Sequence, residues 1–237
     1  MVDPPKLRPK PMRTLDPTEV NILLREAEGS YYYPVIYTAL STGLRQAELL
    51  GLRWRDIDPE IMLSISVNRV LYKRRGVSEF REPKTSRSRR YVSMTPKLAA
   101  FLREYKQERK SLYHELGKEL TLDDFVFGSV EGNPLNPPSL SRDFARIVKR
   151  AGLENVRFHD LRHSFARLML LRGAKPKVIA EALGHASVAF TMDIYSHIIQ
   201  GMQSEAMALL DDVLPSGING RSNDKLTTNV DAKANKN

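Results

Sequence analysis

The spacing of apolar residues changes twice along the chain, and these changes limit the folds that it can adopt. In residues 17–52 apolar side chains recur every three or four positions, which is the period of one face of a helix. Between residues 56 and 94 they alternate, which is the period of a strand with one buried face. Helical spacing returns from Pro96 onward. The chain is therefore predicted to be mainly α-helical with a small three-stranded antiparallel sheet, whose short strands are expected near residues 61–65, 70–72 and 90–92.

Local signals place the individual helices and the ends of the domain. Asp16, a following proline and Glu19 combine an acidic cap, a proline at the first helical position and an acidic first turn, so they predict a helix start. One domain is expected over residues 15–214, between a basic linker or arm at 1–14 and a polar, disordered tail at 215–237. Further helices are expected over residues 32–40, 45–52, 96–116, 140–151, 159–172, 175–183, 188–196 and 202–213.

The composition narrows the class of partner. The chain has 237 residues, a formal net charge of +9 and an isoelectric point near 9.7, which favours a polyanion, with nucleic acid first and an acidic membrane surface second. Basic residues are dense between Arg69 and Arg90, and this charge favours a phosphate-facing loop over a merely solvated one. The absence of cysteine excludes disulfides and thiolate-bound zinc. No apolar run approaches the roughly 20 residues of a membrane span, so a soluble, cytoplasmic protein is expected.

The first candidate site residue is Arg45, in the segment Thr42-Gly43-Leu44-Arg45. Gly43 permits a tight turn before a helix start and places Arg45 in the first turn. Glu48, three residues later, lies on the same helix face, where it can orient the guanidinium. An Arg–Glu pair is also ordinary on a helix surface, and the segment alone leaves both interpretations open.

A second cluster is His159-Asp160-Leu161-Arg162-His163. On a helix, positions 159, 162 and 163 share a face, so His159 and Arg162 can each bind one oxygen of a phosphate. A zinc site through His159 and His163 is disfavoured, because the segment lacks the glutamate of a zinc-protease motif and the chain lacks cysteine. His163 is expected to be a packed, hydrogen-bonded residue behind the site.

The third cluster follows at Leu183-Gly184-His185, with Tyr195 ten positions after His185. Gly184 fits the C-cap of a helix, so His185 is expected to emerge at the turn between two helices. A tyrosine by itself is more often a packing residue than a nucleophile. The order of the three clusters is what distinguishes Tyr195.

These clusters resemble the catalytic domain of the tyrosine recombinases, the phage-integrase family, over about residues 14–214. That family shows an arginine in T-G-L-R, a lysine in a β-hairpin, H-x-L-R, L-G-H and a tyrosine nine or ten residues further on. The hairpin lysine is assigned to Lys84, in Pro83-Lys84-Thr85, with Lys73 as the competing candidate. The resemblance implies the fold of the DNA breaking-rejoining enzymes.

The resemblance also implies a role for each side chain. Tyr195 would attack a DNA phosphodiester, giving a 3′-phosphotyrosine and a free 5′-hydroxyl. Arg45 and Arg162 would hold the non-bridging oxygens, and His185 would donate to the same phosphate. His159 would assist proton transfer at the tyrosine, and Lys84 would protonate the departing 5′-oxygen. The resemblance implies no metal ion, nucleotide or other cofactor.

Partners and alternatives follow from the same resemblance. It implies double-stranded DNA, self-association as a tetramer on DNA through the helix at 202–213, and accessory DNA-bending proteins; the same helix stripe also suits packing on its own domain. Because only about 14 residues precede the domain, weak, salt-sensitive DNA binding is expected. A helix-turn-helix regulator with Tyr195 as packing is disfavoured, because the helix at 188–196 has few base-reading side chains. A type IB topoisomerase and an inactive integrase remnant share the site and remain open.

Overall fold

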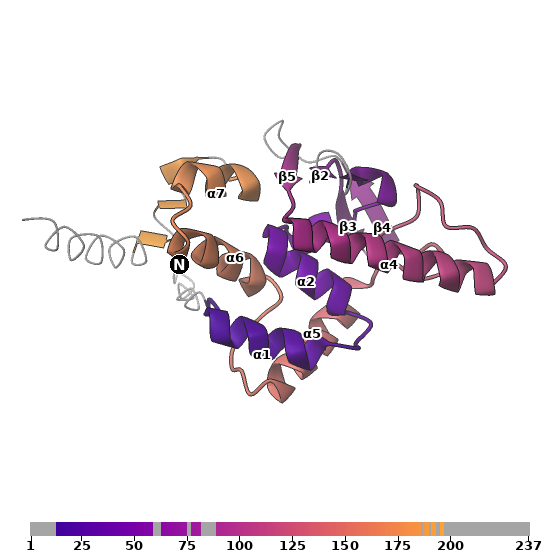
Figure 1. Cartoon of the computed structure of the whole chain (residues 1–237), viewed down its shortest axis with the longest axis horizontal. Coiled ribbons are helices and arrows are strands. Elements are labelled where there is room, and N and C mark those ends of the chain that lie inside the picture. Colours follow the sequence, from indigo (N-terminus) through magenta and orange to yellow (C-terminus); the bar gives the residue numbers. More distant parts are fainter. Residues whose placement is uncertain are drawn as a thin grey trace, which may run out of the picture. The chain divides into compact units, whose positions relative to one another are not determined.

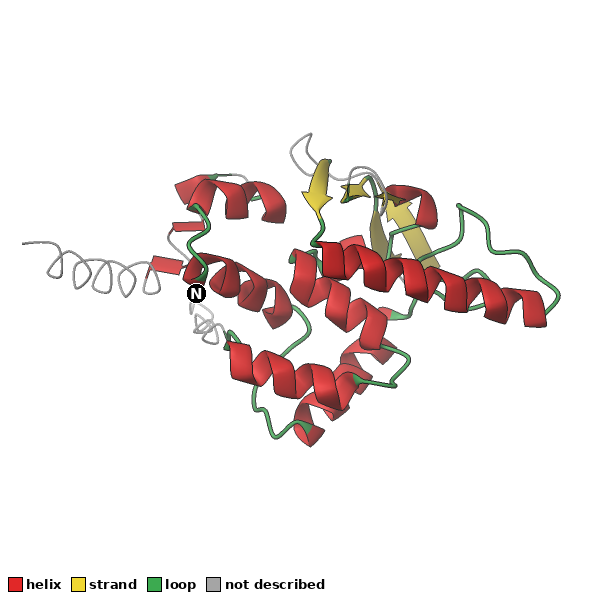
Figure 2. Cartoon of the chain, in the orientation of Figure 1, coloured by secondary structure: helices red, strands yellow, loops and turns green. Residues whose placement is uncertain are grey.

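Helices make up most of the structure, and the strands gather beside them (Figures 1 and 2). The computed structural model describes residues 13–58, 63–74, 77–81, 89–185, 187–189, 191–192 and 195–196. All of these belong to one compact unit, residues 1–198. The expected tail and the helix at 202–213 lie outside the described residues, as does nearly all of the expected arm.

The first helices begin and end at the signals that the sequence carries. At the start of α1 (Pro17–Ala27), the Asp16 carboxylate accepts from the Glu19 amide at 2.8 Å, and the Glu19 carboxylate accepts from the Asp16 amide at 3.0 Å. This capping box satisfies two backbone donors that would otherwise lack partners. The elements that follow are α2 (Tyr33–Thr42), the short α3 (Gln46–Leu49) and a 3-10 turn, η1 (Trp54–Asp56).

The predicted three-stranded antiparallel sheet is present, but its strands differ from those expected. It consists of β1 (Ile57–Asp58), β2 (Ser64–Val67) and β5 (Arg90–Ser93), in the order β1-β2-β5. The strands β3 (Val70–Arg74) and β4 (Val77–Arg81) form a separate two-stranded sheet. The sequence pattern missed β1 because two residues are too few to show alternation, and it missed β4 because Val77 and Phe80 are three positions apart and so do not alternate.

Four longer helices complete the described unit. They are α4 (Pro96–Glu115), α5 (Pro137–Arg150), α6 (Asp160–Leu171) and α7 (Pro176–Leu183). The helix α2 packs against α1, α4 and α6, and its Val35, Ile36 and Ala39 are buried in the core. In the expected helix at 188–196, the residues that the structure describes are helical. Across the described ranges, no helix combines the length and the apolar character needed to cross a bilayer.

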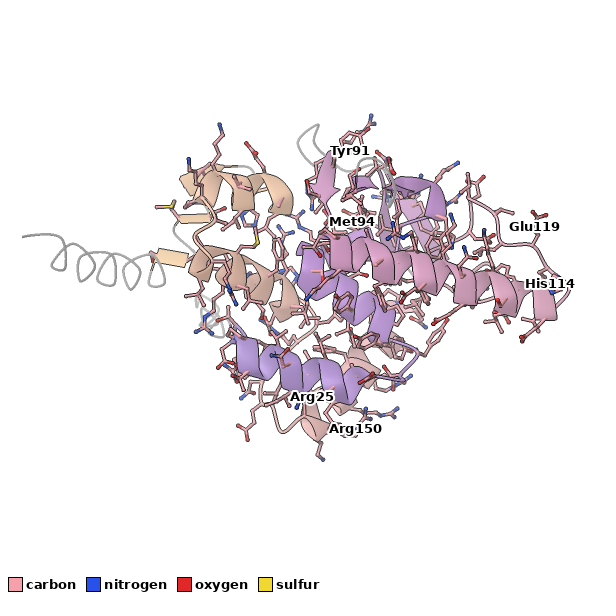
Figure 3. The ribbon with its side chains drawn as sticks, viewed as in Figure 1. Arg25, Tyr91, Met94, His114, Glu119 and Arg150 are labelled. Atoms are coloured by element: carbon pink, nitrogen blue, oxygen red, sulfur yellow. The ribbon has the colours of Figure 1, made fainter. Side chains whose placement is uncertain are left out.

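The strand β5 lies between the core and the solvent. Val92 pairs with Ile65 of β2, and both side chains are buried. Tyr91, on the other face of the strand, is 73% exposed and points away from the helices (Figure 3). The neighbouring Arg90 turns inward, so β5 contributes a basic side chain to the interior.

Candidate active site

The turn between α2 and α3 positions Arg45. Gly43 ends α2 with a positive φ of 66°. A Cβ atom at this position would lie 2.4 Å from Phe165 Cδ1 and 2.7 Å from Leu183 Cδ2, so the backbone approaches α6 and α7 more closely than any side chain allows. Arg45 follows as the N-cap residue of α3.

Glu48 orients Arg45 as the helix spacing predicts. Its Oε2 accepts from the Arg45 amide at 2.8 Å, and its Oε1 accepts from Arg45 Nη1 at 2.9 Å. Glu48 is 3% exposed, and burial alone would raise the pKa of its carboxyl. Hydrogen bonds and charges from Arg90 and Arg45 outweigh this effect, so the pKa lies below its ordinary value and the carboxylate stays ionised.

Arg90 is a second partner of Glu48, and the sequence pattern did not identify it. Arg90 Nη1 and Nη2 lie 3.1 Å from Glu48 Oε1 and Oε2, and Nε donates to the Ala182 carbonyl at 2.8 Å. The Arg90 side chain is 8% exposed. The run of basic residues that contains Arg90 was expected to form a phosphate-facing loop, and that expectation did not place Arg90 against a carboxylate. A glutamate packed among leucines was the available signal, because a buried carboxylate needs more than one donor.

Arg162 forms hydrogen bonds to the ends of two helices, α2 and α7. Its Nη1 donates to the Gly43 carbonyl at 2.8 Å, and its Nη2 donates to the Leu183 carbonyl at 2.7 Å. Burial and the positive charge of Arg45 lower its pKa to about 9, which leaves the guanidinium protonated at neutral pH. The positive charges of Arg45 and Arg90 also act on Arg162, and the Glu48 carboxylate opposes them. A cluster of guanidinium groups of this kind suits an anion.

His163 contacts both His159 and Tyr195. Its ring meets the His159 ring edge-on, with the centroids 5.1 Å apart. Its Nδ1 lies 3.0 Å from the Tyr195 hydroxyl. Burial, then the charge of His159, lowers the pKa of His163 to about 4, and burial and Arg162 lower the pKa of His159. Both rings are therefore neutral at neutral pH.

Tyr195 lies inside the site. Its side chain is 1% exposed, and burial raises its pKa to about 12, against a smaller lowering by Arg162. In the part of the chain that the structure describes, the phenol bonds to His163 and no hydrogen bond joins it to His159. From the sequence, His163 was expected behind the site and His159 at the tyrosine, whereas the structure brings His163 to the hydroxyl.

His185 follows the end of α7. Gly184 caps that helix with a φ of 63°, as the sequence predicts. The His185 Nδ1 lies 2.7 Å from Thr191 Oγ1, a contact that no sequence motif signals. Burial and the charges of Arg162 and Arg45 lower the pKa of His185 to about 4. A cavity of about 490 Å³ borders this side of the site, lined by residues that include Arg90, Lys177, Gly184 and His185.

The assignment of the hairpin lysine is not tested by the described residues. Lys84 lies in residues 82–88, outside the described part of the chain. The assignment of the hairpin lysine to Lys84 therefore stays a prediction. The hairpin is formed by β3 and β4, and it carries Lys73, whose side chain also lies outside the described residues.

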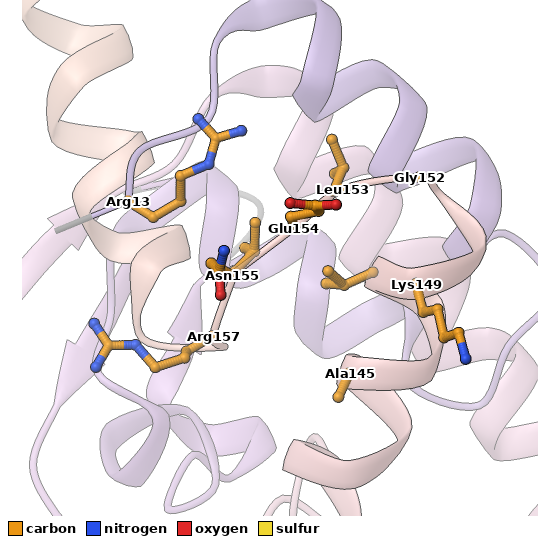
Figure 4. Close-up of a pocket in the computed structure, with 10 residues that line it drawn as sticks. Arg13, Ala145, Lys149, Gly152, Leu153, Glu154, Asn155 and Arg157 are labelled. Carbon is orange, nitrogen blue, oxygen red and sulfur yellow. The ribbon is translucent and has the colours of Figure 1, made fainter. Parts of the chain in front are cut away.

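A larger pocket is located elsewhere. It has a volume of about 980 Å³, lies beside the C-terminal part of α5, and is lined by residues that include Arg13, Lys149, Glu154 and Arg157 (Figure 4). None of the predicted site residues lines it. Among the described residues, no three His, Asp or Glu side chains are grouped so that they can hold a metal ion.

The sequence is similar to those of known proteins. Residues 13–201 match the family described as the phage integrase family. The ICEBs1 integrase of Bacillus subtilis (strain 168) is 36% identical over 183 residues, which are 77% of this chain and 49% of the relative. The prophage integrase IntR of Escherichia coli (strain K12) is 33% identical over 220 residues, 87% of this chain and 52% of the relative. The chain spans about half the length of the curated relatives that it matches.

Solved structures share the fold. The Tn1549 transposon integrase, in complex with circular intermediate DNA, superposes with a TM-score of 0.70 and 26% identity, over 84% of this chain and 68% of that one. XerA recombinase gives a TM-score of 0.64 and 26% identity, over 84% and 66%. The family match covers well over half of the sequence, and the fold agrees with it. The chain therefore belongs to the phage integrase family, the tyrosine recombinases.

Proposed function

We propose that this chain is the catalytic domain of a site-specific tyrosine recombinase, which cleaves and rejoins double-stranded DNA through a 3′-phosphotyrosine intermediate. The observation that carries this proposal is the buried Tyr195 hydroxyl, 3.0 Å from His163 Nδ1 in the cluster that also holds Arg162 and His185. A buried phenol needs a hydrogen-bond partner, and here that partner belongs to the same cluster as the predicted phosphate-binding residues. The energy of the broken phosphodiester is kept in the phosphotyrosine, so rejoining needs no ATP.

The same proposal gives each predicted residue a role. Tyr195 attacks the phosphorus, and Arg45 and Arg162 bind the non-bridging oxygens and stabilise the charge of the five-coordinate transition state. His185 donates a hydrogen bond to the same phosphate, and His159 assists proton transfer at the tyrosine. Lys84 gives a proton to the departing 5′-oxygen. Glu48 positions Arg45 and is held in turn by Arg90.

The wider properties of the chain fit this role. A net charge of +9 favours a polyanionic partner, and a transposon integrase of the same fold is described in complex with circular intermediate DNA. We extend the proposal to a catalytic domain at 15–214, an arm at 1–14 and a tail at 215–237, acting in the cytoplasm. Assembly as a tetramer on DNA, with accessory DNA-bending proteins, belongs to the same proposal.

The test is covalent trapping on a nicked duplex. The nick lets the cleaved fragment diffuse away, so a phosphotyrosine adduct accumulates and survives SDS. The native chain should form the adduct, and Tyr195→Phe should bind the same DNA without forming it. A native chain that binds DNA and forms no adduct, or an adduct that persists in Tyr195→Phe, would contradict the proposal.

A further inference from the structure

A pocket of about 470 Å³ is formed by the turn before α2, the first residues of that helix and one side of α4. The two helices pack against each other (Figure 1). None of the predicted site residues lines this pocket. Its wall includes four aromatic side chains, those of Tyr31, Tyr33, Phe101 and Tyr105. The volume lies in the range of small-molecule sites, and aromatic walls of this kind suit a flat apolar ligand.

Arg109 places a guanidinium in this aromatic wall. Its side chain is 4% exposed, and among the described residues no carboxylate forms an ion pair with it. Its Nη2 donates to the Tyr113 hydroxyl over a long 3.4 Å, and its Cζ lies 5.1 Å from the centroid of that ring. Its Nε is buried and has no hydrogen-bond partner in the described part of the chain. A buried cation without an anionic partner costs stability, so this arrangement favours an anion supplied by a ligand.

Helical spacing gathers these groups on one face of α4. Phe101, Tyr105, Arg109 and Leu112 follow one another at intervals of four, four and three positions, and all of them line the pocket. From the turn before α2, Ser30 adds a hydroxyl whose oxygen is buried and, within the described ranges, unpaired. The pocket therefore combines polar groups that lack partners with flat apolar walls.

The other charges of the pocket limit which anion it can take. Burial raises the pKa of Tyr31 and raises that of Tyr105 to about 12, so both phenols are uncharged at neutral pH. Glu104 and Glu108 also line the pocket, and both are exposed. Two carboxylates beside one guanidinium repel a polyanion or a phosphate dianion more strongly than a single negative charge.

We propose that this pocket binds a small aromatic carboxylic acid. Its carboxylate pairs with the guanidinium of Arg109, whose planar donors match the two carboxylate oxygens, and its ring packs against the aromatic wall. The hydroxyl of Ser30 provides a further polar contact. This binding goes beyond recombination and does not rest on it, because no residue of the candidate active site takes part.

Calorimetry with 3-phenylpropionate tests the proposal, and NMR shift changes locate the site. The native chain should bind this acid saturably with a Kd in the low-millimolar range or tighter, as expected for a molecule of this size. The amide 3-phenylpropanamide has nearly the same shape without the charge, and it should bind at least about 30-fold more weakly. Phenyl phosphate should also bind more weakly than the acid, because it carries more negative charge.

Variants of the charged residues test their separate roles. Arg109→Met keeps most of the length of the side chain and should weaken binding of 3-phenylpropionate at least about 30-fold. Arg25→Met, at an exposed position of α1 (Figure 3), is the matched control and should bind it as the native chain does. Glu104→Gln combined with Glu108→Gln should bind it more tightly. Because Met removes an unpaired buried charge, Arg109→Met should unfold at no lower urea concentration than the native chain.

Four results would overturn the proposal. They are no saturable binding of 3-phenylpropionate by the native chain, binding by Arg109→Met within about threefold of native, tighter binding of phenyl phosphate than of the acid, and a clear fall in the urea midpoint of Arg109→Met. The last would make Arg109 a packing residue. Tyr195→Phe should bind 3-phenylpropionate with native affinity, so a failure of the proposed recombinase function would leave this result unchanged.

Discussion

The guanidinium of Arg90 meets the carboxylate of Glu48 edge to edge, with both nitrogen–oxygen distances at 3.1 Å. The same guanidinium donates from Nε to the Ala182 carbonyl at 2.8 Å. One side chain of β5 thereby holds α3, which presents Arg45, against the end of α7, which presents His185. Arg45 and His185, which we propose to bind the phosphate, are thus positioned relative to one another by Arg90.

This contact predicts that Arg90→Lys impairs the protein although it conserves the charge. A lysine cannot make two parallel hydrogen bonds to Glu48 and a third to Ala182. Because the pair is buried, we expect a loss of about 1–3 kcal/mol in the free energy of unfolding and roughly 10-fold slower cleavage. Urea unfolding checks the first effect, and adduct formation checks the second. The matched change at an exposed position, Arg25→Lys on α1, should alter stability by less than about 0.5 kcal/mol.

Gly43→Ala tests the close approach of the α2–α3 turn to its neighbours. A methyl group there would meet Phe165 at 2.4 Å and would also have to adopt a positive φ, so we expect a loss of more than about 2 kcal/mol. Gly29→Ala is the control, since its φ is 72° but nothing lies within 4 Å of the added atom. That change should cost only about 1 kcal/mol. Equal losses in the two variants would show that Gly43 tolerates a side chain.

The histidines predict how stability depends on pH. Burial and nearby charges lower the pKa values of His163 and His185 from 6.5 to about 4. The unfolded chain therefore binds protons more readily than the folded protein below about pH 6.5, and stability should fall from there down to about pH 4. Because both side chains are half-buried, the loss should be roughly 1–2 kcal/mol for each. Urea midpoints measured between these pH values should fall less steeply for His163→Asn, and an unchanged slope would argue against the lowered pKa.

Thr191 should matter for catalysis through His185. Its hydroxyl lies 2.7 Å from His185 Nδ1, and its side chain is fully buried. Thr191→Val keeps the shape and removes the hydrogen bond, so we expect about 10-fold slower cleavage as His185 loses its orientation. Thr191→Ser restores the hydroxyl and should recover most of the rate. If Ser and Val behaved alike in the adduct assay, Thr191 would act by packing alone.

Signals that lie within a few residues of each other predicted the structure well. The helix start at Asp16 and the helix end at Gly184 depend on local backbone geometry, and both were placed correctly from the sequence. The approximate course of the strands also followed, because alternation is local. The partners of those strands did not, and β4 was assigned to no sheet because its residues alternate poorly.

Contacts between distant parts of the chain were beyond reach of the pattern. The pair of Arg90 and Glu48 spans 42 positions, and the contact between His163 and Tyr195 spans 32. Each residue was visible in the sequence, but a charged or aromatic side chain has many possible partners until the fold selects one. The resemblance to a family supplied the order of the motifs, whereas the particular neighbours of each side chain came only from the packing.

The cluster of positive charge around Glu48 has a consequence for the protein as a whole. The charges of Arg45 and Arg90 repel that of Arg162 inside the fold, and Glu48 opposes this repulsion. A phosphate bound in the site would reduce this repulsion, so its binding free energy would add to the stability of the folded state. Substrate binding and stability are therefore coupled. The repulsion lowers the stability of the free domain, and binding to DNA should raise its melting temperature.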